Sequence, residues 1–420
     1  MTATPDRALL VTRIAAIGVA IGAVVSPPVA NVFAGVMLIA FFFVADVRER
    51  LHAAAVSRIA KGVVIFAAAL LLATLVAAFN PQGIKVALPH LFGWRTLLLM
   101  LIAFMVFDAE EWKVRLAVAF VVFASIGAIV SLIAWKVGWQ YNKELEPGVV
   151  LRNTVTQAMA FAIAAFLAGV LLATRSVTAR PGQLLLGAAI LLLLGLLVFL
   201  QTGRSGQLML LVLIVVAAAV LLRGPRRAFV IAAVPVLALV AINVSPVMQA
   251  RFHQAWNELN SAAQGTEYSS MGIRVVMWQN TAELIKARPI VGYGLGGMRP
   301  AYEAYVKNSA ATGWQATVTG DPHNQYLAVW VDAGLPGLLA FLFMLAAVAL
   351  QPAPAPWRAV AVALLLAWCA TSMASSHFQT FNEGHLIAIL LGAFLAPSGV
   401  RESEPQAAAS TAATAALTSS

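Results

Sequence analysis

The residues best suited to chemistry lie late in the chain, and the first is the histidine of Asp321-Pro322-His323-Asn324. This order predicts a helix start, with Asp321 as the N-cap and Pro322 at the first helical position. His323 would then lie at the positive end of a helix dipole, which favours a neutral imidazole able to accept a proton. One interpretation is therefore a general base, and the other is an interfacial histidine within an aromatic belt.

The second candidate is an arginine on the apolar side of an amphipathic helix. The pattern predicts a helix over residues 270–287, capped by a serine at 269 or 270 and ended by the Arg-Pro pair at 288–289. At about 100° per residue, Arg274 falls within the apolar arc that includes Trp278. Its planar fork suits a phosphate in a lipid-lined pocket, and the alternative is a side chain that snorkels to water.

The third candidate is Arg204, in the short turn Thr202-Gly203-Arg204-Ser205-Gly206. Here we expect the glycines to let backbone N–H groups approach an anion, and Ser205 to cap the following helix. An ordinary turn with one solvated charge is the alternative. Two further arginines, Arg152 and Arg95, are weaker candidates of the same kind.

No cofactor or metal site is predicted. The run Gly292-Tyr293-Gly294-Leu295-Gly296-Gly297 matches GxGxxG, but no strand precedes it, so we interpret it as a turn between two helices. His323, His377 and His385 share no spacing typical of a zinc site. The single cysteine, Cys369, lies in an apolar run, which excludes an intrachain disulfide and a cysteine metal site.

These polar residues must be positioned by a membrane protein. Hydrophobic residues make up 61% of the chain and charged residues 10%, with a mean hydropathy of +0.88, whereas soluble domains are about 25% charged. The Lys and Arg behind the net charge of +10 are scattered in short loops, so nucleic acid is not a predicted partner. The predicted fold class is an all-α polytopic protein in contact with membrane lipids.

About twelve apolar stretches approach the length of about 20 residues that crosses a bilayer. They cover residues 9–25, 29–45, 60–79, 90–107, 115–135, 153–173, 183–201, 206–222, 228–245, 325–348, 357–375 and 384–397. With a cytoplasmic N-terminus, 15 of the 27 Lys and Arg fall in inner segments and 6 in short outer loops, in keeping with the positive-inside rule. Both termini are then cytoplasmic, and the long loop between spans nine and ten is extracytoplasmic.

The chain is predicted to have four parts. Residues 1–245 form spans one to nine, residues 246–324 form the loop that carries the active residues, and residues 325–397 form spans ten to twelve. Residues 398–420 are expected to be a disordered cytoplasmic tail, because Ala, Ser and Thr dominate them. A transporter of lipid-linked glycans is an alternative, but it predicts an internal repeat and charged residues at mid-span, and the sequence has neither.

Four motifs and the layout together resemble the O-antigen ligase and polymerase superfamily. The motifs are Thr202-Gly203-Arg204-Ser205-Gly206, Gly272-Ile273-Arg274 with Trp278, Pro289-Ile290-Val291-Gly292-Tyr293-Gly294, and Asp321-Pro322-His323-Asn324. They lie between residues 201 and 337, in a chain with about twelve spans and a long late loop. The chain departs from the family after Arg152, where relatives often have an Asn-Pro-Asn-like element and this sequence has Asn153-Thr154-Val155-Thr156-Gln157.

The resemblance implies a GT-C-like membrane glycosyltransferase at the periplasmic face of the bacterial inner membrane. Such a ligase transfers polysaccharide from undecaprenyl diphosphate to a sugar hydroxyl of lipid A-core, with inversion and without a metal. The family's histidine corresponds to His323 as general base, and its two arginines correspond to Arg204 and Arg274 at the diphosphate. Further candidates for substrate binding are Arg152, Arg95, Trp278 and Asn324. An O-antigen polymerase and a protein O-oligosaccharyltransferase of the same superfamily remain alternatives, because no motif encodes the acceptor.

Overall fold

The computed structural model describes residues 6–80, 83–262, 269–309 and 312–398, and these residues form helices without strands. The helices are α1 (Arg7–Val25), α2 (Pro27–Phe42), α3 (Val47–Ala55), α4 (Arg58–Ala78), α5 (Gly83–Gly93), α6 (Thr96–Val106), α7 (Glu110–Lys136), α8 (Thr154–Ala173), α9 (Arg180–Phe199), α10 (Arg204–Leu221), α11 (Gly224–Val244), α12 (Pro246–Ala262), α13 (Ser270–Ala287), α14 (Met298–Lys307), η1 (Gly313–Ala316), α15 (Gln325–Ala349), α16 (Trp357–Thr371) and α17 (Phe381–Leu395). The predicted tail falls almost entirely on residues 399–420, outside the described residues.

Membrane spans dominate this set of helices. In the described part of the chain, nine helices are long and apolar enough to cross a membrane, or up to ten if the bent pair α2 and α3 forms one span. Helices α16 and α17 are also apolar, with 15 residues each. Each predicted apolar stretch coincides with a helix or a helix pair of this set, so the prediction of an all-α polytopic membrane protein is confirmed.

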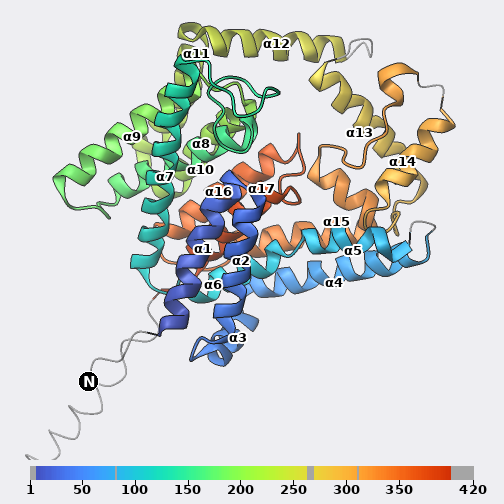
Figure 1. Cartoon of the computed structure of the whole chain (residues 1–420), viewed down its shortest axis with the longest axis horizontal. Coiled ribbons are helices and arrows are strands. Elements are labelled where there is room, and N and C mark those ends of the chain that lie inside the picture. Colours follow the sequence, from blue (N-terminus) through green and yellow to red (C-terminus); the bar gives the residue numbers. More distant parts are fainter. Residues whose placement is uncertain (1–5, 81–82, 263–268, 310–311, 399–420) are drawn as a thin grey trace, which may run out of the picture.

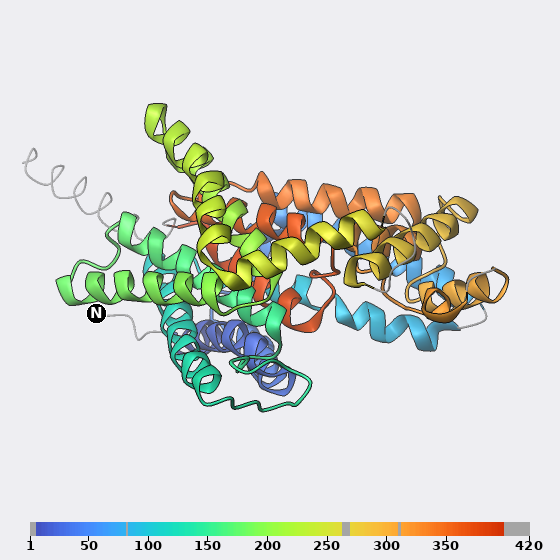
Figure 2. The same cartoon turned by 90° about the horizontal axis from the view of Figure 1, so that it is seen from above.

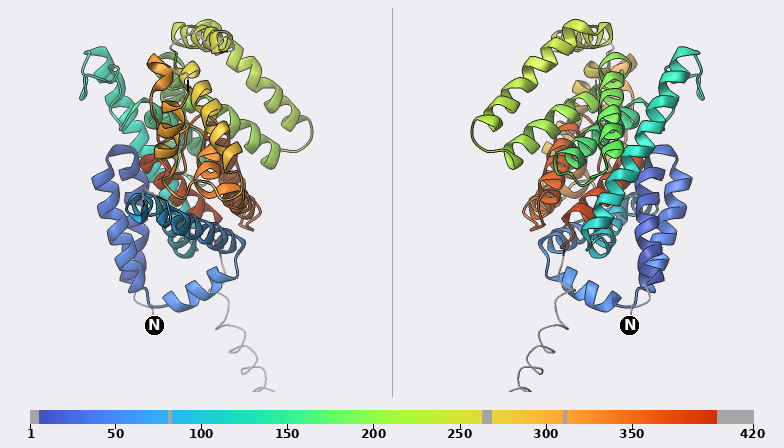
Figure 3. Two further views of the ribbon diagram at one scale, coloured as in Figure 1. Left: turned by 90° about the vertical axis from the view of Figure 1, so that its right-hand side faces the viewer. Right: turned by 90° about the vertical axis from the view of Figure 1, so that its left-hand side faces the viewer.

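Loops and short helices lie in two separate regions of the molecule. We define the loop face as α12, α13 and α14 with the segments 137–153, 200–203, 319–324 and 372–380. In Figure 1, α12 lies at the top, α13 and α14 lie at the right, and α3 lies at the bottom (Figures 1 and 3). On the loop face, Thr156 of α8 donates a hydrogen bond to Glu383 of α17 (2.7 Å). At the α3 face, Arg58 of α4 donates to the carbonyl of Leu350, after α15 (2.7 Å).

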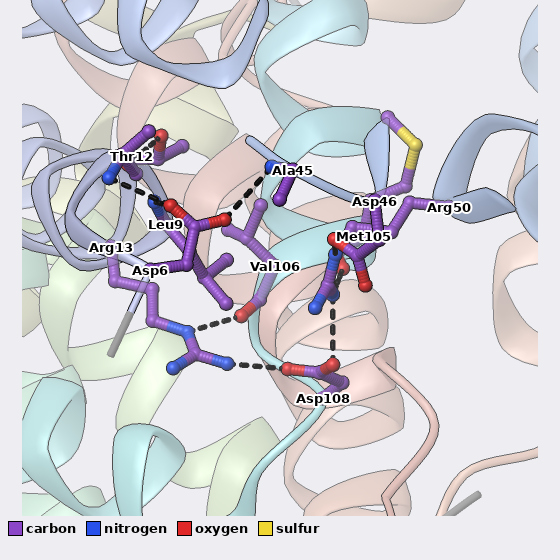
Figure 4. Close-up of polar contacts among 11 residues, drawn as sticks. Asp6, Leu9, Thr12, Arg13, Ala45, Asp46, Arg50, Met105, Val106 and Asp108 are labelled. Atoms are coloured by element: carbon purple, nitrogen blue, oxygen red, sulfur yellow. Dashed lines mark hydrogen bonds and ion pairs between the residues drawn. The ribbon is translucent and has the colours of Figure 1, made fainter. Parts of the chain in front are cut away.

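Ion pairs hold the α3 face together (Figure 4). Arg13 of α1 and Arg50 of α3 bind different oxygens of Asp108, which lies between α6 and α7, and Arg50 also binds Asp46 at 2.7 Å. The side chains of the two arginines are only 12% and 8% exposed. Because a buried guanidinium without a carboxylate partner is costly, this network fixes the sharp bend between α2 and α3.

A break in α15 anchors the polar loop to the membrane helices. Gly334 interrupts the helix with a φ of 66°, and a Cβ there would lie 1.9 Å from the carbonyl oxygen of Ile290. The break frees the N–H of Leu335, which donates to the carbonyl of Pro289 at 2.9 Å. The turn after α13 is therefore seated in α15, and the loop is not a separate domain.

Glycines shape that turn. Gly292, Gly294 and Gly296 have φ values of 68°, 81° and 75°, which only glycine adopts at little cost. The backbone of Leu295 donates to the carbonyl of Ala73 in α4 at 3.0 Å. The expected turn between two loop helices is confirmed, and it packs against α4 as well as α15.

Candidate active site on the loop face

Arg204, the first residue of α10, is held by a carboxylate from the loop. Its two terminal nitrogens donate to the two oxygens of Glu258 at 2.9 and 3.1 Å. Glu258 belongs to α12, which crosses above the membrane helices toward α13 (Figure 2). Gln254 donates to the same carboxylate at 2.8 Å, and the Glu258 side chain is only 6% exposed. The pair joins a membrane helix to the loop, and Glu258 is a residue that the sequence analysis missed.

The electrostatics of Glu258 extend to a second arginine. Burial raises the pKa of this carboxyl, but the hydrogen bonds and charge of Arg204, the hydrogen bond from Gln254 and the charge of Arg274 outweigh it, so the pKa is lowered. Burial also lowers the pKa of the Arg274 guanidinium, with a contribution from the positive charge of Arg204, while Glu258 opposes the shift. The charges of both arginines therefore act on one buried carboxylate, and Arg204 also forms an ion pair with it.

Gly203 and Gly206 beside Arg204 serve helix packing. A Cβ at Gly206 would lie 2.5 Å from atoms of Ala158, and one at Gly203 would lie 2.8 Å from the carbonyl oxygen of Thr154. The close approach of α10 to α8 therefore requires glycine at both positions. The prediction that Ser205 caps the helix is wrong, because α10 already begins at Arg204 with Gly203 as its N-cap.

Arg274 lies in the first turns of α13, whose predicted bounds and cap are confirmed. The hydroxyl of Ser269 accepts from the N–H of Gly272 at 3.0 Å, and the helix ends at Ala287 before Arg288. One terminal nitrogen of Arg274 donates to the hydroxyl of Ser270 at 2.9 Å. The arginine is half-buried, as its place in the apolar arc predicts.

Two donors on this face of α13 are unsatisfied. The Nε of Arg274 and the Nε1 of Trp278 are both shielded from solvent, and neither finds an acceptor among the described residues. Residues four apart lie side by side on a helix, and leaving one buried donor unpaired costs about 1–3 kcal/mol. Such a pair of donors is typical of a site where a ligand supplies the acceptor oxygens.

His323 lies immediately before α15, in a strained backbone conformation with a φ of 50°. The N-cap of α15 is Asn324, whose side chain accepts from the N–H groups of Tyr326 and Leu327, so the prediction of Asp321 as N-cap is wrong. Asp321 instead accepts from the backbone N–H of His323 at 2.8 Å, and its other oxygen lies 3.9 Å from the imidazole Nδ1. Asn and Asp are both good caps, and the tight turn through Asp321 moves the helix start to the later one.

The segment 372–380 holds this turn in place. Ser376 donates to Asp321 at 2.6 Å, and Asn324 donates to the carbonyl of Met373 at 3.0 Å. The side-chain oxygen of Gln325 accepts from the N–H of Phe378 at 3.0 Å. These contacts join residues about 50 positions apart, which no local pattern reveals, and they occupy the side-chain amide of Asn324.

His377 is a buried histidine on which several charged residues of the loop face act. It is 2% exposed, and neither ring nitrogen has a hydrogen-bond partner among the described residues. Burial lowers its pKa, Glu383 and Asp321 oppose the shift, and the charges of Arg274 and His323 add to it. The charges of Arg274 and His323 thus both act on the His377 imidazole.

The two weaker candidates, Arg95 and Arg152, have other partners than the Arg204–Glu258 pair. Arg95 donates to Asn31 at 3.0 Å and lies over the ring of Phe92, 4.4 Å from its centroid. Arg152 is exposed, and its carbonyl accepts from Tyr141 at 2.7 Å. Neither arginine has a recorded contact with the Arg204–Glu258 pair in the described residues.

The segment after Arg152 is structural. Asn153 caps α8 by accepting from the N–H of Thr156 at 2.8 Å, and buried Gln157 accepts from Val150 and Leu151 at 2.8 and 2.9 Å. As for metals, the residues with described placement hold no group of three or more His, Cys, Asp or Glu that could bind an ion.

Fold and site thus define a polytopic helical membrane protein with a cationic, histidine-bearing site under a folded loop. Residues 188–342 match the family model described as O-antigen ligase. This segment runs from α9 into α15 and contains Arg204, Arg274 and His323. The match confirms the resemblance to the O-antigen ligase superfamily over this segment of the chain.

One relative is an uncharacterized protein of Haemophilus influenzae. It is 30% identical over 119 residues, which make up 27% of this chain and 29% of the relative. The chain thus matches less than a third of that protein's length.

Proposed function

We propose that the protein is a glycosyltransferase that joins polysaccharide carried on undecaprenyl diphosphate to a sugar hydroxyl of lipid A-core. The reaction takes place at the periplasmic side of the bacterial inner membrane, with both termini in the cytoplasm. The family match over residues 188–342 supports a ligase- or polymerase-type activity on lipid-linked polysaccharide. The proposal rests on two observations: Arg204 pairs with the buried Glu258, on which the charge of Arg274 also acts, and Arg274 and Trp278 carry unsatisfied donors.

The arginines bind the diphosphate of the donor. The Nε–H of Arg274 and the indole N–H of Trp278 supply donors that lack acceptors, and oxygens of the diphosphate satisfy them. Glu258 balances the charge of the two guanidinium groups and orients Arg204 until the donor binds. Positive charge at this position stabilises the leaving group as the sugar–phosphate bond breaks, and one well-placed donor contributes about 10²–10³ in rate.

His323 takes the proton from the attacking hydroxyl. The hydroxyl oxygen forms a bond to the anomeric carbon while the bond from that carbon to the phosphate oxygen breaks, and its electron pair goes to the diphosphate. Attack opposite the leaving group inverts the anomeric centre. Asp321 stabilises the imidazolium, because its free oxygen lies 3.9 Å from Nδ1. General-base catalysis of this kind contributes about 10²–10⁴ in rate.

Complementation in a strain that lacks its own ligase tests the proposal. We expect the wild-type chain to restore polysaccharide on lipid A-core, and His323→Ala or Arg274→Ala at equal membrane levels to fail. Matched controls are His253→Ala on α12 and Lys286→Ala on α13, both exposed, which should behave as wild type. Attachment by both site variants at the wild-type level rejects the proposal, and a longer donor glycan with a bare core identifies a polymerase.

A further inference from the structure

An open cavity of about 320 Å³ with a mixed polar and apolar lining lies at Asp321, two positions before His323. It is lined by residues of α5, α15, the start of α14 and the segments 320–321 and 376–380, and neither Arg204 nor Arg274 lines it. The polar side chains in its wall are those of His90, Asp321, Asp332, Ser376, Gln379 and Thr380.

The lining favours a neutral ligand with many hydroxyl groups. Asp321 and Asp332 offer carboxylate oxygens that accept hydrogen bonds, and Gln379 and Thr380 can donate as well as accept. No Lys or Arg lines the cavity, so a phosphate there would meet carboxylates without a compensating charge. The volume is at the lower end of the range of about 300–1,000 Å³ for small-molecule sites, which suits a sugar unit.

The wall at Asp321 connects this cavity to the proposed proton acceptor. One oxygen of Asp321 accepts from the backbone of His323 and from the hydroxyl of Ser376. A sugar that contacts Asp321 from the cavity therefore touches a residue two positions before His323, whose backbone N–H donates to Asp321. The two arginines lie outside the cavity, so the geometry separates a cationic region from an uncharged or acidic one.

Helix α5 gives the cavity an apolar border. His90 and Gly93 line the cavity, while Leu88 and Phe92 of the same helix are 50% and 66% exposed. Exposed apolar residues on a membrane helix contact lipid acyl chains. A ligand that combines sugars with acyl chains fits both sides of this helix.

We propose that this cavity binds the acceptor, as a neutral sugar unit of an acyl-anchored glycolipid, while the diphosphate of the donor binds at Arg204 and Arg274. The inference rests on the proposed function and adds the acceptor subsite to it. Asp332 also shapes the subsite, because its oxygens accept from the N–H groups of Gly296 and Met298 at 3.0 and 3.2 Å.

Gly93 allows a selective test. A Cβ at this half-buried helical position would meet no atom within 4 Å, so Gly93→Leu adds a side chain at the cavity wall whose Cβ has free space. Gly187 of α9 is also half-buried and helical, and a Cβ there meets nothing within 4 Å. Gly187→Leu is therefore the matched control, because it adds the same side chain away from the cavity.

The experiment measures transfer in liposomes with lipid-linked polysaccharide as donor and purified lipid A-core as acceptor. We expect Gly93→Leu to raise the KM for lipid A-core about tenfold or more, with the KM for the donor unchanged, since only uniform binding of the acceptor is lost. Gln379→Ala and Thr380→Val remove polar groups without adding volume, and each should raise the acceptor KM about three- to tenfold. If Gly93→Leu does not fold, the acceptor KM of these two variants still tests the subsite.

Acceptor KM values that stay at the level of Gly187→Leu in all three variants overturn the subsite. A rise in the donor KM in place of the acceptor KM also overturns it, because the cavity then holds the donor. A wild-type protein that attaches nothing to lipid A-core rejects the proposed function itself. An active wild type with unaffected cavity variants rejects only the subsite.

Discussion

The backbone conformation of His323 predicts which of two variants, His323→Gly or His323→Ala, has the larger free energy of unfolding. With a φ of 50°, a residue with a Cβ carries a cost of about 1–2 kcal/mol that glycine avoids. Glycine in turn loses about 0.4–1 kcal/mol through the greater freedom of the unfolded chain. The first term is larger, so His323→Gly should be more stable than His323→Ala by about 0.5–1 kcal/mol, the difference of these two terms.

His253 provides the reference position, because it is an exposed residue inside helix α12. In a helix interior alanine is preferred over glycine by about 1 kcal/mol, so the order of the two variants should be reversed there. The assay is thermal unfolding of the four purified variants in one detergent, with transfer activity measured in parallel. Both variants at His323 should lose transfer, and both at His253 should keep it. An alanine variant at His323 that is the more stable of its pair refutes the strained conformation.

Three further predictions concern the arginines and their supports. Glu258→Gln removes a carboxylate whose pKa is lowered in the folded protein. The wild type should therefore lose stability as the pH falls below about 4.5. In unfolding scans, the variant should be less stable than the wild type at pH 7 and should lose less stability on acidification. Gly206→Ala places a Cβ 2.5 Å from Ala158 and should displace α10, so that transfer falls about tenfold or more at equal protein level; a normal rate contradicts the packing. Arg274→Lys keeps the charge but loses the fork and Nε, and its donor KM should rise about tenfold; an unchanged KM argues against a diphosphate contact at Arg204 and Arg274.

Local patterns predict the helices of this protein well. Helix α13 has the predicted bounds because a serine cap at one end and an Arg-Pro pair at the other are local signals. The membrane helices follow from apolar length alone. Local signals do not decide which residue caps α15, because Asp321 and Asn324 are both good N-caps. Contacts with Ser376 and Met373, about 50 positions later, favour Asn324 as the N-cap.

Contacts between distant segments could not be predicted in this way. Glu258 reaches Arg204 across 54 positions, and no spacing along α12 marks it as a buried partner. The break at Gly334 depends on the carbonyl of Ile290 in another segment. Local patterns predict Arg204 and Arg274 as candidates, but only the fold reveals the buried carboxylate that pairs with Arg204.

The most direct test of the account is single-turnover transfer by purified His323→Ala in liposomes, with labelled lipid-linked polysaccharide and lipid A-core. We expect transfer to be slower than wild type by about 100-fold or more, while binding of the donor, which depends on the arginines, stays within about twofold. His323→Ala that labels lipid A-core at the wild-type rate contradicts the central claim that this histidine takes the proton from the acceptor hydroxyl.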